Sequence, residues 1–183
     1  MSTVLARLEP SRNDADALLA DALADLHTRS RRSAYRGVYG DSYLDHELAD
    51  ISRASWRKRF EIHDPASDLI LAAMENGAPV GLAYASFRIN PDVGLFLDNL
   101  HVAPERKGGG LGSSLLAGVA RWLVEEHAGA PLHLDVYAPN KAALDFYERN
   151  GGIAVARYRE VVPGGNEVDT VRYRWERPRI LLA

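Results

Sequence analysis

Four glycines lie close together between a predicted strand and a predicted helix, and this segment restricts the fold more than any other. The strand is expected over residues 93–102, and the helix begins near Gly110. Glycine lets the backbone turn sharply and bring its N–H groups close to a ligand. The first N–H groups of a helix have no internal acceptors and lie at the positive end of the helix dipole. The segment 100–116, with Arg106 and Lys107, therefore predicts an anion site of the kind that binds phosphate.

Two familiar phosphate motifs do not fit this segment. A P-loop requires the pattern G-x-x-x-x-G-K-[ST], which does not occur in the chain. The dinucleotide fingerprint requires a third glycine where Ser113 stands, in the first unit of a parallel sheet. The glycines alone are equally consistent with a flexible connection, so the residues themselves leave both readings open.

The order of the predicted elements indicates an α/β or α+β domain. Asn76-Gly77 favours a hairpin, because both residues tolerate a positive φ. Strands are expected at 3–8, 68–74, 80–87, 93–102, 132–137, 153–161 and 168–175. Helices are expected at 13–27, with a continuation toward residue 36, and at 44–60, 110–127 and 140–149. An antiparallel meander followed by a strand–helix–strand unit predicts a mixed sheet with helices on its faces.

Composition excludes several classes of function. The chain has 183 residues, which suits a single domain, and it contains no cysteine. Thiol nucleophiles, cysteine-based zinc sites and iron–sulfur clusters are therefore excluded. With 22 Lys and Arg against 25 Asp and Glu, the net charge of −3 argues against a nucleic-acid partner. No signal peptide and no apolar run of about 20 residues is evident, so we expect a cytoplasmic protein with no membrane partner.

Two segments resemble the GNAT superfamily of N-acetyltransferases. The spacing of Val102, Lys107, Gly110 and Gly112 is similar to the acyl-CoA-binding motif of that family, which usually has Gln or Arg where this chain has Lys107. Downstream, a second family motif is matched by Val136, Asn140, Ala143, Tyr147 and Gly151. The family commonly has Phe after that glycine, where this chain has Gly152. The resemblance covers residues 68–175, and the first 60 residues fit only by element order.

The resemblance implies a single domain over residues 1–183, with acceptor-side helices in 1–60 and an acyl-CoA-binding core in 68–175. It implies a mostly antiparallel sheet whose central parallel pair is splayed apart, with acetyl-CoA as cosubstrate in the gap and no metal. The pantetheine arm would follow the strand 93–102, and the pyrophosphate would lie on the glycine turn. The cofactor-binding residues that it implies are Leu100, His101, Val102, Lys107, Gly108, Gly109, Gly110, Leu111, Gly112, Ser113, Asn140 and Tyr147.

The reaction implied is direct attack of a primary amine on the thioester in a ternary complex. Tyr147 matches the family tyrosine that protonates the leaving thiolate. For the general base we select Asp98, which on strict alternation shares a face with Leu100 and Val102, whereas a bulge would change that. A histidine or water are the alternatives, with His101, His133 and Asp135 on the two splayed strands.

The acceptor is expected to be an amine of a small molecule or a peptide. By resemblance, its site is built from residues 29–50 and 161–169. The run 29–36 carries four arginines, and such a run is usually a solvated helix face. If it lines the site, it favours an acidic acceptor or the phosphates of CoA, whereas the acidic and aromatic residues that follow suit a cationic amine. Two other functions stay open, a non-catalytic acyl-CoA sensor of the same fold and a nucleotide-binding domain of another fold. The family also often dimerises through its last strands, so a homodimer is one expected arrangement.

Overall fold

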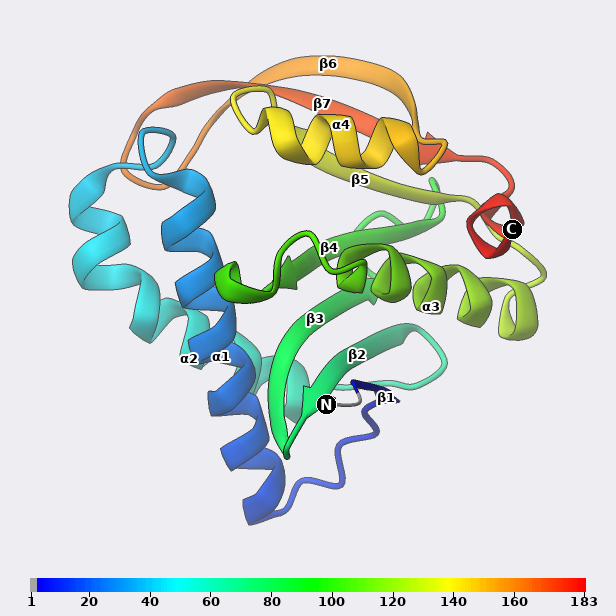
Figure 1. Cartoon of the computed structure of the whole chain (residues 1–183), viewed down its shortest axis with the longest axis horizontal. Helices are drawn as coiled ribbons and strands as arrows, with labels where there is room; N and C mark the ends of the chain where they lie inside the picture. Colours follow the sequence, from blue (N-terminus) through cyan, green and yellow to red (C-terminus); the bar gives the residue numbers. More distant parts are fainter. Residues whose placement is uncertain (1–2) are drawn as a thin grey trace.

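The computed structural model describes residues 3–183, in which strands and helices succeed one another largely as predicted (Figure 1). The strands are β1 (Val4–Arg7), β2 (Asp68–Glu75), β3 (Ala78–Ser86), β4 (Leu95–Val102), β5 (Leu132–Tyr137), β6 (Ile153–Val161) and β7 (Glu167–Trp175). The α-helices are α1 (Asp14–Tyr35), α2 (Leu48–Glu61), α3 (Leu111–Glu126) and α4 (Lys141–Arg149). A π-helical turn (Tyr43–Glu47) precedes α2, and short 3₁₀ turns lie at Pro104–Arg106 and Pro178–Leu182.

All seven strands form one sheet, in the order β1-β2-β3-β4-β5-β7-β6. Every neighbouring pair is antiparallel except β4 and β5. These two parallel strands pair only at Leu95 with Leu132 and at Phe96 with His133, although both strands continue for several residues. The predicted mixed sheet with a splayed central parallel pair is therefore confirmed.

The two faces of the sheet are covered by different helices. On one face, α3 and α4 pack on a core that includes Leu115, Leu123 and Tyr147. On the other face, α1 and α2 pack through residues such as Leu23 and Trp56. Strand β2 alternates between the two cores, and this double burial explains its continuous apolar run. The prediction of helices on both faces is confirmed.

A bulge interrupts the pairing of β3 with β4. Tyr84 pairs with Asn99, whereas the next residue, Ala85, pairs with Leu97. Asp98 is therefore the extra residue of β4 and has no partner on β3. A bulge of this kind bends the strand and changes the face toward which the following side chains point. It occurs where β4 leaves β5, next to the gap between them.

Some predicted boundaries differ from the observed ones. Helix α1 is one continuous helix of 22 residues, so the arginine-rich run to Tyr35 belongs to it. The third strand of the meander begins at Leu95 rather than at residue 93, because Gly94 has a φ of 120° and lies against the backbone of Pro131. The Asn-Gly hairpin is confirmed, with both of its residues at positive φ.

Gly152 occupies the position at which the GNAT superfamily commonly has Phe. A Cβ atom on Gly152 would lie 2.7 Å from Cζ2 of Trp175 and 2.9 Å from the carbonyl oxygen of Tyr147. Trp175 is only 2% exposed, and its Nε1 donates a 2.8 Å hydrogen bond to the carbonyl of Asn150. The indole from the end of β7 therefore fills the space next to α4, and Gly152 makes room for it.

Candidate active site

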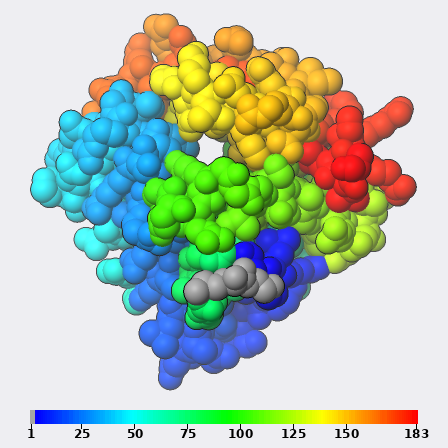
Figure 2. Space-filling model, in the orientation of Figure 1, coloured from blue at the N-terminus to red at the C-terminus, as the bar shows by residue number. Residues whose placement is uncertain are grey.

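The divergence of β4 and β5 opens a cleft in the middle of the molecule. The cleft holds a cavity of about 620 Å³ whose walls come from α1, β4, the glycine turn, the start of α3, β5 and α4. The space-filling view shows an opening bounded by the blue α1 region, the green turn before α3 and yellow α4 (Figure 2). A cavity of this size between splayed strands is large enough to enclose part of an extended cofactor.

The glycine turn forms one end of this cleft. Gly108 and Gly110 have φ values of 81° and 79°, a conformation that glycine adopts without strain. Gly110 is the N-cap of α3 and has no side chain over the first free N–H groups of the helix. Arg106 donates to Glu75 at 2.5 Å, whereas Lys107 lines the cavity and forms no ion pair within residues 3–183. Lys107 is therefore the available cation beside the turn.

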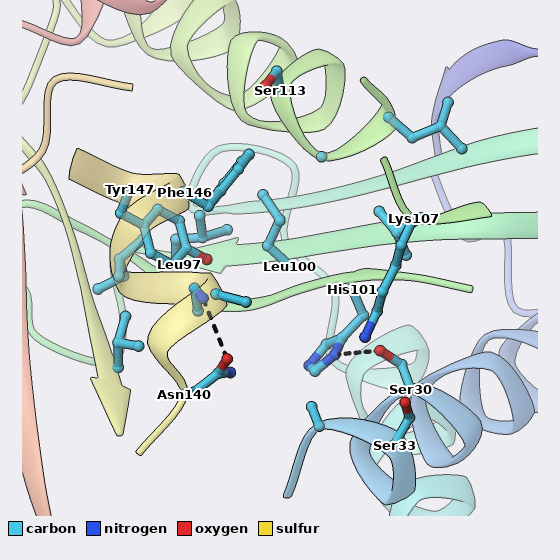
Figure 3. Close-up of a pocket in the computed structure, with 18 of the residues that line it drawn as sticks. Ser30, Ser33, Leu97, Leu100, His101, Lys107, Ser113, Asn140, Phe146 and Tyr147 are labelled. Atoms are coloured by element: carbon cyan, nitrogen blue, oxygen red, sulfur yellow. Dashed lines mark hydrogen bonds between the residues drawn. The ribbon is translucent and has the colours of Figure 1, made fainter. Parts of the chain in front are cut away.

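Most of the residues predicted to bind a cofactor lie together in this cleft (Figure 3). All of them line the cavity except Gly109, which is absent from its walls. Sequence reasoning missed the contribution of α1, which places Ser30 and Ser33 opposite Lys107 and His101 (Figure 3). It also missed Phe146 as a wall residue. No local signal marks the α1 residues, because only the tertiary packing brings them to the cleft.

Asn140 is the N-cap of α4 and also lines the cavity. Its Oδ1 accepts a 3.2 Å hydrogen bond from the N–H of Ala143. The side-chain amide remains beside the cleft (Figure 3). The capping role that its residue type favours is therefore observed, and its position also allows contact with a ligand.

Tyr147 lies on the side of α4 that faces the cleft, in the core between the sheet and α4. Its ring packs against Phe146, Tyr173 and Trp175, with centroid separations of 5.0, 6.1 and 6.0 Å. The side chain is 8% exposed and lies close to Leu97 (Figure 3). Burial, with a smaller contribution from Tyr35, raises the pKa of Tyr147 well above the ordinary value of 10. The phenol is consequently held in its protonated form at neutral pH.

Asp98 does not lie on the face that strict alternation predicts. Leu100 and Val102 pack on the α3 side of the sheet, whereas Asp98 lines a second cavity together with Phe96 and His101. The prediction that Asp98 shares a face with Leu100 and Val102 is therefore wrong, and the bulge in β4 is the reason. Asp98 nevertheless also reaches the wall of the first cavity, so it stands where the two cavities meet.

Two hydrogen bonds hold the Asp98 carboxylate. It forms an ion pair with Arg59 of α2 at 2.5 Å and accepts from the amide of Asn99 at 2.6 Å. Burial raises the pKa of Asp98 above its ordinary value, while the charges of Arg59 and Arg31 act in the opposite direction. A carboxylate with a raised pKa is a better proton acceptor than an ordinary one.

The other candidate bases are less favourable. The Nδ1 atom of His101 lies 3.0 Å from Oγ of Ser30, and burial lowers the pKa of His101 to about 3. His133 is fully buried, outside both cavities, and burial lowers its pKa to about 4. Asp135 is held by Arg172 through two hydrogen bonds of 2.8 Å. At neutral pH both histidines are neutral weak bases. Asp135 accepts two hydrogen bonds from one guanidinium, whereas Asp98 accepts only one from Arg59.

A second cavity of about 330 Å³ opens from the first one, on the α1–α2 side of the sheet. The two cavities share Tyr35, Asp98, His101 and Asp135 as wall residues. A molecule in the second cavity would therefore meet the end of a molecule in the first. The predicted acceptor side is found there only in part, because the segment 161–169 packs against the connection between α1 and α2 instead.

The four arginines of residues 29–36 have different partners in the folded chain. Arg31 alone lines the second cavity, and it donates a 2.9 Å hydrogen bond to the hydroxyl of Tyr39. The other three bind partners within the chain, namely Glu105 for Arg29, the carbonyls of Leu44 and Asp45 for Arg32, and the carboxylates of Asp41 and Asp45 for Arg36. Sequence reasoning also missed Tyr158 and Glu160 of β6, which complete the wall of this cavity.

Neither a metal centre nor a membrane span is found in the part of the chain that the structure describes. Among residues 3–183, no three acidic or histidine side chains are grouped so as to hold a metal ion. No helix in that range combines the length and apolarity that crossing a bilayer requires.

A splayed parallel pair with a glycine turn leading into a helix at its mouth is the arrangement that the resemblance to the GNAT superfamily implied. This chain belongs to the acetyltransferase (GNAT) family, whose family model matches residues 22–152. No curated protein matches the sequence significantly.

Solved structures share the fold along almost the whole chain. A GNAT-family protein from Desulfovibrio desulfuricans is 23% identical, with a TM-score of 0.68 over 96% of this chain and 99% of its own. The PaiA N-acetyltransferase from Thermoplasma acidophilum, solved in complex with coenzyme A, is 17% identical, with a TM-score of 0.68 over 93% and 98%. YncA from Salmonella typhimurium, solved with acetyl-CoA, is 17% identical, with a TM-score of 0.65 over 96% and 94%.

Proposed function

We propose that this protein transfers the acetyl group of acetyl-CoA to a primary amine of a small molecule or peptide, by direct attack in a ternary complex. The observation that carries the proposal is a pair of adjacent cavities that share four wall residues. One is lined by the glycine turn and the splayed strands, and the other meets it at Tyr35 and Asp98. The structures of PaiA with coenzyme A and of YncA with acetyl-CoA support the assignment of the first cavity to the cofactor.

In this proposal the cofactor lies along the first cavity. The backbone N–H groups of residues 107–112 bind the pyrophosphate, with Lys107 and Ser113 beside it. The pantetheine arm follows β4 at Leu100–Val102, where β5 has moved away and leaves backbone groups of β4 unpaired. A backbone N–H of this part of β4 also stabilises the oxyanion of the tetrahedral intermediate.

The proton transfers follow from the chemistry of aminolysis. An amine with a pKa near ~10 must lose a proton before it attacks, and we assign this step to Asp98, directly or through water. The amine nitrogen forms a bond to the thioester carbon and loses its second proton to water, and the carbon–sulfur bond then breaks. Tyr147 gives its proton to the leaving thiolate and regains one from solvent. Burial keeps the phenol of Tyr147 protonated at neutral pH, so it holds a proton to give, although the raised pKa makes it a weaker acid than a free tyrosine.

The decisive experiment is a screen of amines and peptides that follows the release of the coenzyme A thiol. The chain contains no cysteine, so the thiol signal has no protein background. Acetylation of at least one amine, confirmed by mass spectrometry of the product, would support the proposal. Saturable binding of acetyl-CoA without turnover across the panel would instead indicate a non-catalytic acyl-CoA sensor. Binding of ATP or NAD, but not of coenzyme A, would contradict both.

A further inference from the structure

The second cavity contains a cation that the protein itself does not neutralise. Arg31 lines this cavity and stacks on Tyr39 and Tyr35, with its guanidinium carbon 5.1 and 6.0 Å from the ring centroids. Its hydrogen bond to Tyr39 is neutral, and within residues 3–183 Arg31 forms no ion pair. The neighbouring Arg59 also lines the cavity, but it is already paired with Asp98. An unneutralised arginine in a cavity is a binding group for an anion.

The same cavity also contains a carboxylate that is not paired with a cation in the described chain. Glu160 of β6 accepts a 2.7 Å hydrogen bond from the hydroxyl of Thr170 and has no cationic partner in the described chain. The remaining acidic wall residues differ from it, because Asp98 is paired with Arg59 and Asp135 with Arg172. Counting Arg172 with its partner, three arginines and three carboxylates surround the cavity. The site is therefore neutral overall, with one unpaired charge of each sign.

Polar atoms without partners are also present in the wall. Asn99 is 6% exposed and Ser52 is 1% exposed, and both line the cavity. Neither the Oδ1 atom of Asn99 nor the Oγ atom of Ser52 has a hydrogen-bond partner, and the same holds for Nη1 of Arg59. Buried polar groups are almost always satisfied, but these three atoms are covered by the wall itself. The chemistry of an occupant is therefore inferred from the charges of Arg31 and Glu160.

We propose that the second cavity binds a small zwitterionic acceptor, an amine that also carries a carboxylate. Arg31 holds the carboxylate, and the acidic groups of the cavity compensate the ammonium until it is deprotonated at Asp98. This inference rests on the proposed acetyl transfer and adds to it the class of acceptor. It also accounts for the two opposite indications of the sequence, because the basic run and the acidic and aromatic residues contribute to one cavity.

Two other classes of acceptor fit less well. A polyamine carries several positive charges and would leave Arg31 without a counter-ion, in a cavity that already contains two arginines. A lysine side chain of a folded protein carries no carboxylate near its amine. With a volume of about 330 Å³, the cavity has the size of a small molecule.

The test compares acceptors that differ only in the carboxylate. Leucine, methionine and phenylalanine are each assayed beside their amide and their decarboxylated amine, with thiol release as the readout. We expect kcat/KM to be about 10- to 100-fold higher for at least one amino acid than for its two analogues, since hydrogen bonds to charged groups are the strong ones. The amide has the less basic amine, so intrinsic reactivity would favour it over the acid.

The variants Arg31→Gln and Arg31→Lys test whether Arg31 causes the preference for the amino acid over its amide and amine. Arg31→Gln should abolish the preference for the acid over its amide. This ratio isolates the carboxylate contact, because any effect of Arg31 on the pKa of Asp98 is common to both substrates. Arg31→Lys, which keeps the charge, should restore part of the preference. Arg53→Gln is the matched control, because Arg53 is an exposed arginine of α2 that lies outside both cavities. Thermal unfolding of each variant shows whether it folds.

Binding to the coenzyme A-loaded protein separates this inference from the proposed function. If amines are acetylated but the amides or decarboxylated amines react as well as the acids, the inference is wrong and acetyl transfer stands. If no amine is acetylated but calorimetry shows amino acids binding in a manner that depends on Arg31, the site is supported and the transfer is not. If amino acids neither bind nor react while coenzyme A binds, the inference is overturned.

Discussion

Tyr147 is both a buried packing residue and a wall residue of the first cavity. It packs within an aromatic cluster, and its hydroxyl reaches the cavity in which we propose that the thioester lies. Replacing it with Phe keeps the packing and removes only the proton. We therefore expect Tyr147→Phe to lower kcat by about 100-fold and to leave the Kd for coenzyme A nearly unchanged. Steady-state kinetics and calorimetry provide the two measurements.

Tyr43→Phe is the control for this change. Tyr43 is a buried tyrosine in a separate cluster, beside Leu44 and Val162, and it lines neither cavity. Its loss of a hydroxyl should leave kcat unchanged. A Tyr147→Phe enzyme with full activity would show that water, and not this phenol, protonates the thiolate.

The buried histidines make stability depend on pH. Burial lowers the pKa of His133 to about 4, and it lowers the pKa of His27 well below 6.5. The unfolded chain binds protons at these sites below about pH 6.5, whereas the folded chain does not. Stability is thus fully present above that pH and falls as the pH is lowered toward the folded values. We expect a loss of about 1.4 kcal/mol per pH unit for each such histidine.

Urea unfolding at about pH 7 and pH 5 measures this slope. His133→Leu removes one group that binds a proton in the unfolded chain. The slope of the free energy of unfolding against pH should therefore become shallower by the amount that one bound proton contributes. The exposed His46 provides the control, and His46→Gln should leave the slope unchanged. Equal free energies of unfolding at the two pH values would contradict the buried neutral state of His133 and His27.

At the scale of elements, the turn between β4 and α3 is the part on which cofactor binding depends in our proposal. Gly110 has a positive φ and caps α3. In Gly110→Asp, a side chain and a negative charge would enter the space assigned to the pyrophosphate. We expect the Kd for coenzyme A to rise at least about tenfold, from like-charge repulsion and lost approach of the backbone. Calorimetric titration with coenzyme A measures this change.

Gly77→Asp separates binding from backbone strain. Gly77 has a φ of 80°, nearly that of Gly110, and lies in the β2–β3 hairpin with open space around it. Both variants should lose similar stability, but only Gly110→Asp should lose affinity. An unchanged Kd in Gly110→Asp would mean that the turn is a connector and not a phosphate site.

A second prediction at this scale concerns the contact of Gly152 with Trp175. Because a Cβ at Gly152 would overlap the indole, Gly152→Ala should destabilise the protein by about 1–3 kcal/mol, the usual cost of overpacking. In a Trp175→Phe background the same change should cost less, since the smaller ring leaves room. Free energies of unfolding for the four proteins form a double-mutant cycle, and additivity within about 0.5 kcal/mol would refute the overlap.

Local patterns were sufficient for some parts of the site and insufficient for others. Lys107, Gly110 and Asn140 could be assigned from the sequence because they belong to short motifs at the ends of single elements. Arg31 and Glu160 could not be assigned, since they lie about 130 positions apart and meet only through the packing of α1 on the sheet. Strict alternation gives the wrong face for Asp98. The bulge stated as the alternative is present, but nothing in the spacing of β4 fixes its position. The contact of Gly152 with Trp175 could not be predicted from local sequence either, since Trp175 lies at the end of the last strand.

At the scale of the whole molecule, the sheet is joined at its centre by only two residue pairs. A cofactor lying between β4 and β5 would contact both parts and add to their attachment. We expect saturating coenzyme A to raise the free energy of unfolding by about 2.7 kcal/mol at 100 times its Kd. Backbone hydrogen exchange should slow most in β4, β5 and α4. Protection spread evenly over the chain, or confined to β1 and β2, would contradict binding between the splayed strands.

The two parts of the sheet are also separate in the sequence. Everything from β1 to β4 precedes α3, and everything from β5 to β7 follows it. Tyr158 and Glu160 lie on the last hairpin, whereas the glycine turn lies before α3. Exchange of the edge strand 153–161 between relatives would therefore alter the second cavity without touching the turn or the packing of Tyr173 and Trp175 on Tyr147. In our proposal, a fold divided in this way allows new acceptor specificities to arise from one edge strand, while the residues that bind the cofactor stay the same.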